Sequence, residues 1–283
     1  MTLIDETFAR LRAENEAALI AYVTAGDPNA RYTPKMVEAL IEGGADIIEL
    51  GIPYSDPIAD GPTIQEASTR ALRAGITPPH VMSIAKEIRK KHGLPIVLLT
   101  YYNLVLKMGL NKFLNTAKAS GVEGLVIPDL PFEEANAYRN AAKENQIDTI
   151  FLAAPSTSNE RLNSIVDHTS GFLYLVGVYG VTGARTQMQD STIKLVKQIL
   201  PSTTGKVPLA VGFGISTPEH VRKVVAAGAD GAIVGSAFVK AIEQNQKTPD
   251  KAAEKLRKMA RSLKITTRLN RKALQAGFCD RGK

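Results

Sequence analysis

Cysteine is almost missing from this sequence of 283 residues, and tryptophan is absent altogether. The single cysteine, Cys279, leaves no partner for a disulfide, no CxxC motif and no thiolate cluster for a metal. The four histidines stand in helical contexts without the HxxxH or paired spacing that zinc sites use. The sequence therefore predicts a protein of the reducing cytoplasm with no metal site.

Long apolar runs are missing too. No stretch approaches the ~18 uncharged apolar residues that a membrane-spanning helix needs. The first residues, MTLIDETFARLRAEN, carry acids and bases from Asp5 onward instead of the apolar core of a secretory signal. We therefore expect a soluble, unprocessed protein with no membrane partner.

An excess of basic charge is missing from most of the chain despite a net charge of +7. Residues 251–283 carry 11 Lys and Arg against two acids, whereas residues 1–250 carry 24 bases and 26 acids. A nearly neutral body argues against nucleic acid as a partner. For the basic tail at 264–283, we favour a solvated helix and a flexible end over a nucleic-acid or membrane contact.

Short apolar runs bounded by Gly, Pro or Asp recur along the chain, with helix-like segments between them. Most are continuously apolar, as expected of parallel strands covered on both faces by helices. The eight runs are LIAYVTAG, ADIIELG, PIVLLTYYN, VEGLVIPD, DTIFLAAP, GFLYLVGV, VPLAVGFG and DGAIVGS. An open doubly wound sheet is the alternative, but the first run lacks the GxGxxG of a dinucleotide site.

Eight strand and helix units predict an α/β fold, a single-domain (β/α)8 TIM barrel at residues 1–263 with an extra N-terminal helix. The recurring motif GADIIEL, GVEGLVI and GADGAIV indicates that one module is repeated. The basic C-terminal extension, residues 264–283, follows the barrel.

Glu49 interrupts the apolar strand IIELG near its C-terminal end, where barrel enzymes build their active sites. Strand alternation places Ile47 and Glu49 on one face and Ile48 and Leu50 on the other. If Leu50 packs on the helices, Glu49 points into the barrel mouth, where dehydration raises a carboxyl pKa toward values useful in proton transfer. The alternative is a structural ion pair, although the strands offer almost no basic partner.

Asp60 ends the loop that leaves the same strand. An Asp before Gly is commonly a turn former, but this loop can fold back over the barrel mouth and bring a second carboxylate to the site. No lysine stands at a predicted strand end, which argues against a Schiff-base aldolase.

Glycines follow the last two predicted strands: Gly212 and Gly214 in VGFGIS, and Gly235 before Ser236 in VGSA. Loops at these positions that begin helices are the common phosphate site of a barrel. Tight turns are the plainer explanation. The polar segment YGVTGARTQMQDS suits a closing lid or an ordinary surface loop. Together these features predict carboxylate proton transfer on a phosphorylated substrate.

The chain resembles the α subunit of tryptophan synthase from about Phe8 to Leu263. The motifs that carry the resemblance occur in order: YVTAGDP, ELGIPYSDPIADGPTIQ, TYYN, PDLP, YGVTGAR, VGFGIS and VGSA. Tyr22 and Tyr54 stand where relatives often have Phe. The resemblance implies a lyase of tryptophan biosynthesis that splits indole-3-glycerol phosphate into indole and glyceraldehyde 3-phosphate.

The resemblance also implies residue roles. Glu49 would protonate the indole ring and then accept the glycerol hydroxyl proton, while Asp60 would stabilise the ring nitrogen. The substrate-binding residues would be Tyr22, Ile64, Leu99, Tyr174, Thr182 and Phe213, and the phosphate would meet Gly183, Gly214, Gly235 and Ser236. Thr182 would meet Asp60 when the lid closes.

Relatives work with a β subunit that carries pyridoxal phosphate and receives the indole, so the resemblance implies an α2β2 heterotetramer and no cofactor in this subunit. The loops at 53–56 and 128–131 would face that partner. Two alternatives stay open. The chain could be a largely non-catalytic activating subunit, or another phosphate-binding TIM-barrel isomerase or lyase.

Overall fold

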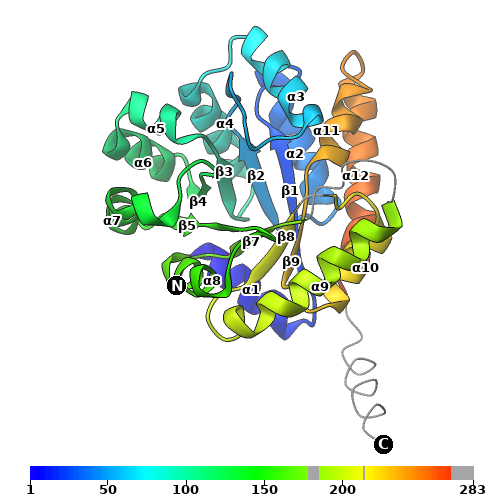
Figure 1. Ribbon diagram of the computed structural model, residues 1–283. Coiled ribbons are helices and arrows are strands. Elements are labelled where there is room, and N and C mark those ends of the chain that lie inside the picture. The colour runs from blue at the N-terminus through cyan, green and yellow to red at the C-terminus, as the bar shows by residue number, and fades with distance from the viewer. Residues whose placement is uncertain (178–184, 213, 269–283) are drawn as a thin grey trace, which may run out of the picture.

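Parallel strands form one sheet that curls into a barrel surrounded by helices (Figure 1). This computed structural model describes residues 1–177, 185–212 and 214–268, and side chains outside 178–190. The order of the strands is β5-β4-β3-β2-β1-β9-β8-β7-β6. They are β1 (Ala18–Thr24), β2 (Ile47–Gly51), β3 (Ile96–Leu99), β4 (Val122–Val126), β5 (Asp148–Ile150), β6 (Leu152–Ala153), β7 (Leu173–Val176), β8 (Leu209–Gly212) and β9 (Gly231–Val234).

Each of the eight predicted apolar runs contains an observed strand, so the predicted barrel is confirmed. The fifth run carries two labels because its pairing changes at Phe151. β5 pairs with β4, β6 pairs with β7, and the carbonyl of Phe151 accepts a hydrogen bond from the Tyr174 amide at 3.0 Å. The one predicted strand therefore pairs with β4 through its first part and with β7 through its second part.

Helices follow the strands and cover the outside of the barrel (Figure 1). Several begin at proline, which is well placed in a first turn, and Gly44, Gly121 and Gly228 follow helix ends at φ of 101°, 79° and 112°. The helices are α1 (Leu3–Ala13), η1 (Ala30–Tyr32), α2 (Thr33–Glu42), α3 (Pro62–Arg73), α4 (Pro78–Lys91), α5 (Tyr102–Met108), α6 (Leu110–Ala119), η2 (Phe132–Glu134), α7 (Asn136–Glu144), α8 (Asn159–His168), α9 (Arg185–Thr203), α10 (Pro218–Ala226), α11 (Ser236–Glu243) and α12 (Pro249–Ile265).

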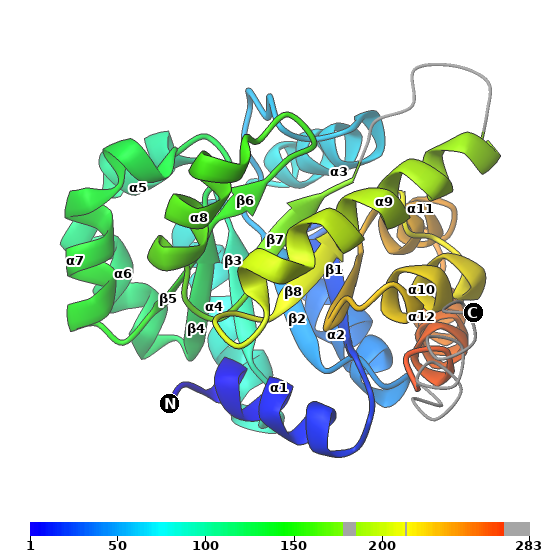
Figure 2. The same cartoon turned by 60° about the horizontal axis from the view of Figure 1, so that its bottom comes forward.

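The strands separate an inner core from an outer one. Ile47 of β2 packs inside the barrel with residues of the other strands, whereas Ile48 and Leu50 pack outside with the helices. The predicted extra helix α1 places Ile4 and Phe8 in the inner core, and Figure 2 shows it below the strands. A Thr2–Asp5 capping box starts this helix. The bottom of the barrel is therefore sealed by α1.

An ion cluster joins α12 to the bottom of the barrel. The ammonium of Lys264 lies 2.8 Å from Asp46 and 3.0 Å from Glu16, and Glu16 also pairs with Arg268 at 2.7 Å. All of these residues but Arg268 have side chains less than 15% exposed. The boundary predicted after Leu263 falls within α12, and of the described residues beyond it, Lys264 and Thr267 pack against the barrel.

Candidate active site

Glu49 lies in β2, between β1 and β3, and it faces the barrel interior because its neighbours Ile48 and Leu50 face outward. Its side chain is fully buried, and neither carboxylate oxygen has a hydrogen-bond partner among the described residues. Burial, and secondarily the charge of Asp60, raises the pKa of Glu49 to about 8. A buried carboxyl without a partner is expensive as an anion, so it is held as a neutral acid near neutral pH.

Asp60 ends the loop between β2 and α3, two residues before the helix begins at Pro62. Its amide bonds the carbonyl of Pro57 at 3.0 Å, and its carbonyl accepts from the Gln65 side chain at 2.8 Å. Burial raises the pKa of Asp60 to about 6, although a hydrogen bond with Tyr101 lowers it. Asp60 is therefore ionised at a pH where Glu49 is still protonated.

Tyr101 is a site residue that the sequence interpretation missed. It follows β3, is 1% exposed, and its hydroxyl oxygen accepts a hydrogen bond from the amide of Ala59 at 3.1 Å. Its ring stacks on Tyr54 with centroids 5.0 Å apart. Because burial and the charge of Asp60 raise its pKa, the hydroxyl keeps its proton. Its place at a strand end, in TYYN, was the available signal.

The predicted apolar slot is partly present in the described residues. Tyr22, Ile64 and Leu99 pack in one cluster, which also contains Ala67 of α3 and Val239 of α11. Leu99 also touches the inner core that holds Tyr174. The structure thus brings these four predicted residues to one end of the barrel. Phe213, Thr182 and Gly183 lie outside the described residues.

Glycines at strand ends make room for the two tyrosines of the site. A Cβ on Gly51 would stand 2.2 Å from the Tyr22 hydroxyl, and a Cβ on Gly212 would stand 2.6 Å from the Tyr174 hydroxyl. Gly212, counted with the phosphate loop in the sequence, is the last residue of β8. Any larger residue at these positions would displace a tyrosine ring.

Gly214, Gly235 and Ser236 lie on the same rim as Glu49. Gly235 directly precedes α11, its carbonyl accepts from the amide of Phe238 at 2.9 Å, and Gly214 adopts φ 75°. In the sheet Tyr22 pairs with Glu49, and the residue before Tyr22 pairs with the residue before Gly235. Glu49, Tyr22 and Gly235 are therefore level on three adjacent strands, about 5 Å apart from strand to strand.

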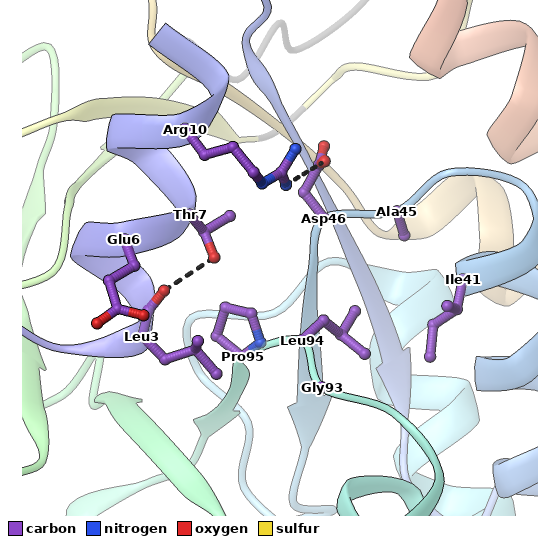
Figure 3. A pocket seen from close by; sticks show the side chains of 10 residues that line it. All are labelled: Leu3, Glu6, Thr7, Arg10, Ile41, Ala45, Asp46, Gly93, Leu94 and Pro95. Carbon is purple, nitrogen blue, oxygen red and sulfur yellow. Dashed lines mark hydrogen bonds and ion pairs between the residues drawn. The ribbon is translucent and has the colours of Figure 1, made fainter. Parts of the chain in front are cut away.

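Two of the hollows among the described residues lie at opposite ends of the barrel. The upper one, of about 390 Å³, is lined by Ile58, Ala59, Asp60, Gly61, Pro62, Pro128, Leu152 and Val176. The lower one, of about 360 Å³, lies under α1, where Arg10 reaches toward Asp46 at 3.7 Å (Figure 3). The upper hollow is lined by Asp60, whose charge also acts on the buried Glu49, so we take it as the candidate active site.

Within the described residues, no group of three or more His, Cys, Asp or Glu side chains is arranged to hold a metal ion. In the same part of the chain, no helix is both long and apolar enough to cross a membrane. What the site offers is a neutral carboxyl, an ionised carboxyl and an apolar slot between them and the glycine loops. This combination can exchange protons with an apolar, anionic substrate.

Comparison with known proteins identifies the family. The family model for the tryptophan synthase alpha chain matches residues 8–268. The tryptophan synthase alpha chains of Arabidopsis thaliana and Methanosarcina barkeri are 45% and 48% identical over 261 residues, which cover 92% of this chain and 94% and 95% of theirs. The crystal structure of the alpha chain from Legionella pneumophila superposes with a TM-score of 0.85 at 33% identity, covering 94% of this chain and 97% of that one. The chain therefore belongs to the tryptophan synthase alpha chain family, the lyase subunit that catalyses the α reaction of tryptophan biosynthesis.

Proposed function

We propose that this chain cleaves indole-3-glycerol phosphate to indole and glyceraldehyde 3-phosphate by a retro-aldol reaction, in which Glu49 transfers the protons and Asp60 stabilises the ring nitrogen. The observation that carries the proposal is the position of Glu49, fully buried in β2 without a hydrogen-bond partner among the described residues, with Asp60 lining the hollow above it. The raised pKa values, about 8 for Glu49 and about 6 for Asp60, agree with this position. Neighbouring carboxyls with pKa values pushed apart are the signature of separate acid and base roles.

The proton transfers balance with these two groups alone. Glu49 gives its proton to the ring carbon that bears the glycerol chain, which turns the ring into an electron sink. Asp60 stabilises the ring nitrogen as it gains positive charge. The ionised Glu49 then takes the proton of the adjacent glycerol hydroxyl, the carbon–carbon bond breaks, and its electrons return to the ring as indole leaves. Glu49 ends protonated, ready for another cycle.

The rim supports binding of both ends of the substrate. The indole would rest against Tyr22, Ile64 and Leu99, which form one apolar cluster. The phosphate would meet the amides of Gly235 and Ser236 at the start of α11, where a helix begins with free amide groups and positive partial charge. Gly214 would add a further amide and Gly183 would also contact the phosphate, while Thr182 would meet Asp60. Tyr174 would lie beside the bond that breaks.

The α reaction belongs to an enzyme with a β subunit as partner. We further propose an α2β2 assembly in the cytoplasm, with pyridoxal phosphate held by the β subunit and no cofactor in this chain. The face nearest the upper hollow is the natural exit for indole, and Ile58 there is 83% exposed. The loop at 128–131 borders that hollow through Pro128, and Tyr54 of the loop at 53–56 stacks on Tyr101, which contacts Ala59 of the hollow. These two loops would make the contact.

Indole release from indole-3-glycerol phosphate is the direct test. Because the chain has no tryptophan, indole can be followed by fluorescence after chromatographic separation, without a protein background. We expect measurable release by the chain alone and faster release with a β subunit. Release only with the β subunit would favour an activating role, and no turnover under either condition would contradict the proposal.

A further inference from the structure

Helix α3 is an addition to the repeating strand and helix plan. It lies between β2 and α4 and packs beside α11 (Figure 1). It matters to the site because Asp60 directly precedes its first turn and Ile64 lies within that turn. Nothing in the strand pairing of β2 fixes this helix, so its position depends on side-chain contacts.

Arg70 provides the polar part of those contacts. Its Nε and Nη2 donate to the two carboxylate oxygens of Asp27 at 2.8 and 2.9 Å, and its Nη1 donates to Glu243 at 3.0 Å. Asp27 lies in the loop after β1 and its side chain is 1% exposed, while Arg70 is 18% exposed. A bidentate Arg–carboxylate pair that is largely buried fixes orientation as well as distance.

The other end of this network leads to the proposed phosphate site. Glu243 is the last residue of α11, the helix that begins at Gly235 and Ser236. Val239 of the same helix packs against Ile64 of α3. Arg70 therefore ties α3, which begins two residues after Asp60, both to the loop after β1 and to the helix that follows the glycine loop.

We propose that Arg70 is a positioning residue for the lyase reaction, which holds α3, and with it Ile64 and the preceding Asp60, at a fixed distance from the phosphate-binding end of α11. The inference rests on the proposed function of the site. Arg70 does not touch the substrate in this arrangement; it acts through the placement of Asp60.

The charged and ionisable neighbours of Asp60 define a readout that simple stability would not move. They are Glu49 of β2, Tyr22 of β1 and Tyr101 after β3. If α3 loosens, Asp60 becomes better hydrated and its pKa falls toward the ordinary carboxyl value. The acidic limb of the profile of kcat/KM against pH would then move to lower pH.

The experiment compares Arg70→Met with Arg73→Met, a matched change at an exposed position on the same helix. For Arg70→Met we expect kcat for indole release to fall by about 10- to 100-fold, as misplacement of a reacting group by an ångström can cause. The acidic limb should shift to lower pH, and Arg70→Lys should recover only part of kcat. Arg73→Met should match the unmodified chain in both measures.

Glu243→Gln decides the matter if Arg70→Met does not fold, because it removes one hydrogen-bonded ion pair and keeps the Asp27 pair. We expect a smaller fall in kcat with a shift of the limb in the same direction. A folded Arg70→Met, or failing that Glu243→Gln, with unchanged kcat and limb would overturn the inference. Inactivity of the unmodified chain and of Arg73→Met would instead contradict the proposed function.

Discussion

Two acidic residues of the second strand segment, Asp46 and Glu49, differ in their partners and in what they contribute to the protein. Asp46 directly precedes β2 at the bottom, and Glu49 lies within the strand toward the top. Asp46 accepts from the Leu19 amide at 2.8 Å and from Lys264 at 2.8 Å, with Arg10 nearby. Glu49 is more deeply buried and has no hydrogen-bond partner among the described residues.

The difference shows what each end stabilises. At the bottom, burial raises the pKa of Asp46, but Lys264 opposes that shift and the carboxylate helps to bind α12 to the barrel. At the top, no cation of the described residues opposes the effect of burial on Glu49, and the nearby charge of Asp60 adds to the shift. A partnered carboxylate supports the fold, whereas a carboxyl left without partners is available for proton transfer.

The largest expected effect is on activity. Glu49→Gln should lower kcat for indole release by at least about 10³-fold, because both proton transfers pass through this one carboxyl. The fold should survive, since glutamine is close to the protonated glutamic acid in size and charge. Indole release and circular dichroism, measured on the same preparation, test both parts.

Glu144→Gln is the matched control, because it makes the same chemical change at the exposed end of α7. It should leave kcat within about twofold, as exposed substitutions usually do. If Glu49→Gln retained near-normal turnover, the contrast between the two ends of β2 would be lost.

The second prediction concerns stability at the bottom. Lys264→Met removes the cation shared by Asp46 and Glu16, whose side chains are 8% and 13% exposed. We expect a loss of about 2 to 4 kcal/mol in the free energy of unfolding, since two buried carboxylates lose their main partner. Indole turnover should stay within about twofold of the unmodified chain, because the candidate active site lies at the opposite end of the barrel.

Lys258→Met serves as the control. It lies on the exposed face of the same helix and removes only a surface pair with Glu254, which should change stability by less than about 1 kcal/mol. Urea unfolding of the three proteins separates the cases. Equal stability of the Lys264 and Lys258 variants would show that the bottom cluster does not support the fold.

A third prediction joins the two ends through pH. The pKa of Glu49 is raised from an ordinary 4.5 to about 8 by folding, so its neutral form is favoured in the folded protein. Its contribution to stability is complete below pH 4.5 and is lost as pH rises toward 8. Glu49→Gln should thus match the unmodified chain near pH 4.5 and exceed its stability by on the order of 3 kcal/mol at pH 7.

Thermal unfolding across pH 5 to 9 measures this difference directly. The gap between the two proteins should open between pH 5 and 8 and then level off. A constant gap across the range would mean that Glu49 is not held neutral by burial.

The sequence was sufficient for the barrel and for the direction of Glu49. Continuous apolar strands and strand alternation depend only on residue order, and the structure has Ile47 inside and Leu50 outside as predicted. The break at Phe151 was not predictable, because it arises where one strand changes partners around a closed ring. Neither was the packing of Lys264, since the first residue of a predicted basic tail is expected to be solvated until its distant carboxylate partners are known.

At the site, a residue with an unusual side chain for its position could be identified from the sequence, whereas its contacts with residues far away in the chain could not. Glu49 stood out as a charge in an apolar strand, but Tyr101 looked like one aromatic among several in TYYN. Its contact with the Ala59 and Asp60 segment joins positions more than 40 residues apart in the chain. The same holds for Arg70, whose partners come from the loop after β1 and the end of α11.

The smallest predicted effect concerns a difference between the two carboxyls of the site. Asp60 has a hydrogen bond with Tyr101, whereas Glu49 has no hydrogen-bond partner among the described residues. Tyr101 lowers the pKa of Asp60 against the effect of burial, so Tyr101→Phe should raise that pKa. The acidic limb of kcat/KM should move to higher pH by about half a unit, the size expected for one hydrogen bond to a charged group shared with water. Tyr54→Phe, which removes the neighbouring hydroxyl that accepts from Asn103, should leave the limb in place. Arg70→Met is expected to loosen α3 and to move the acidic limb to lower pH. Opposite shifts in Tyr101→Phe and Arg70→Met would therefore assign the acidic limb to Asp60. A limb that stays in place in both variants would belong to another group.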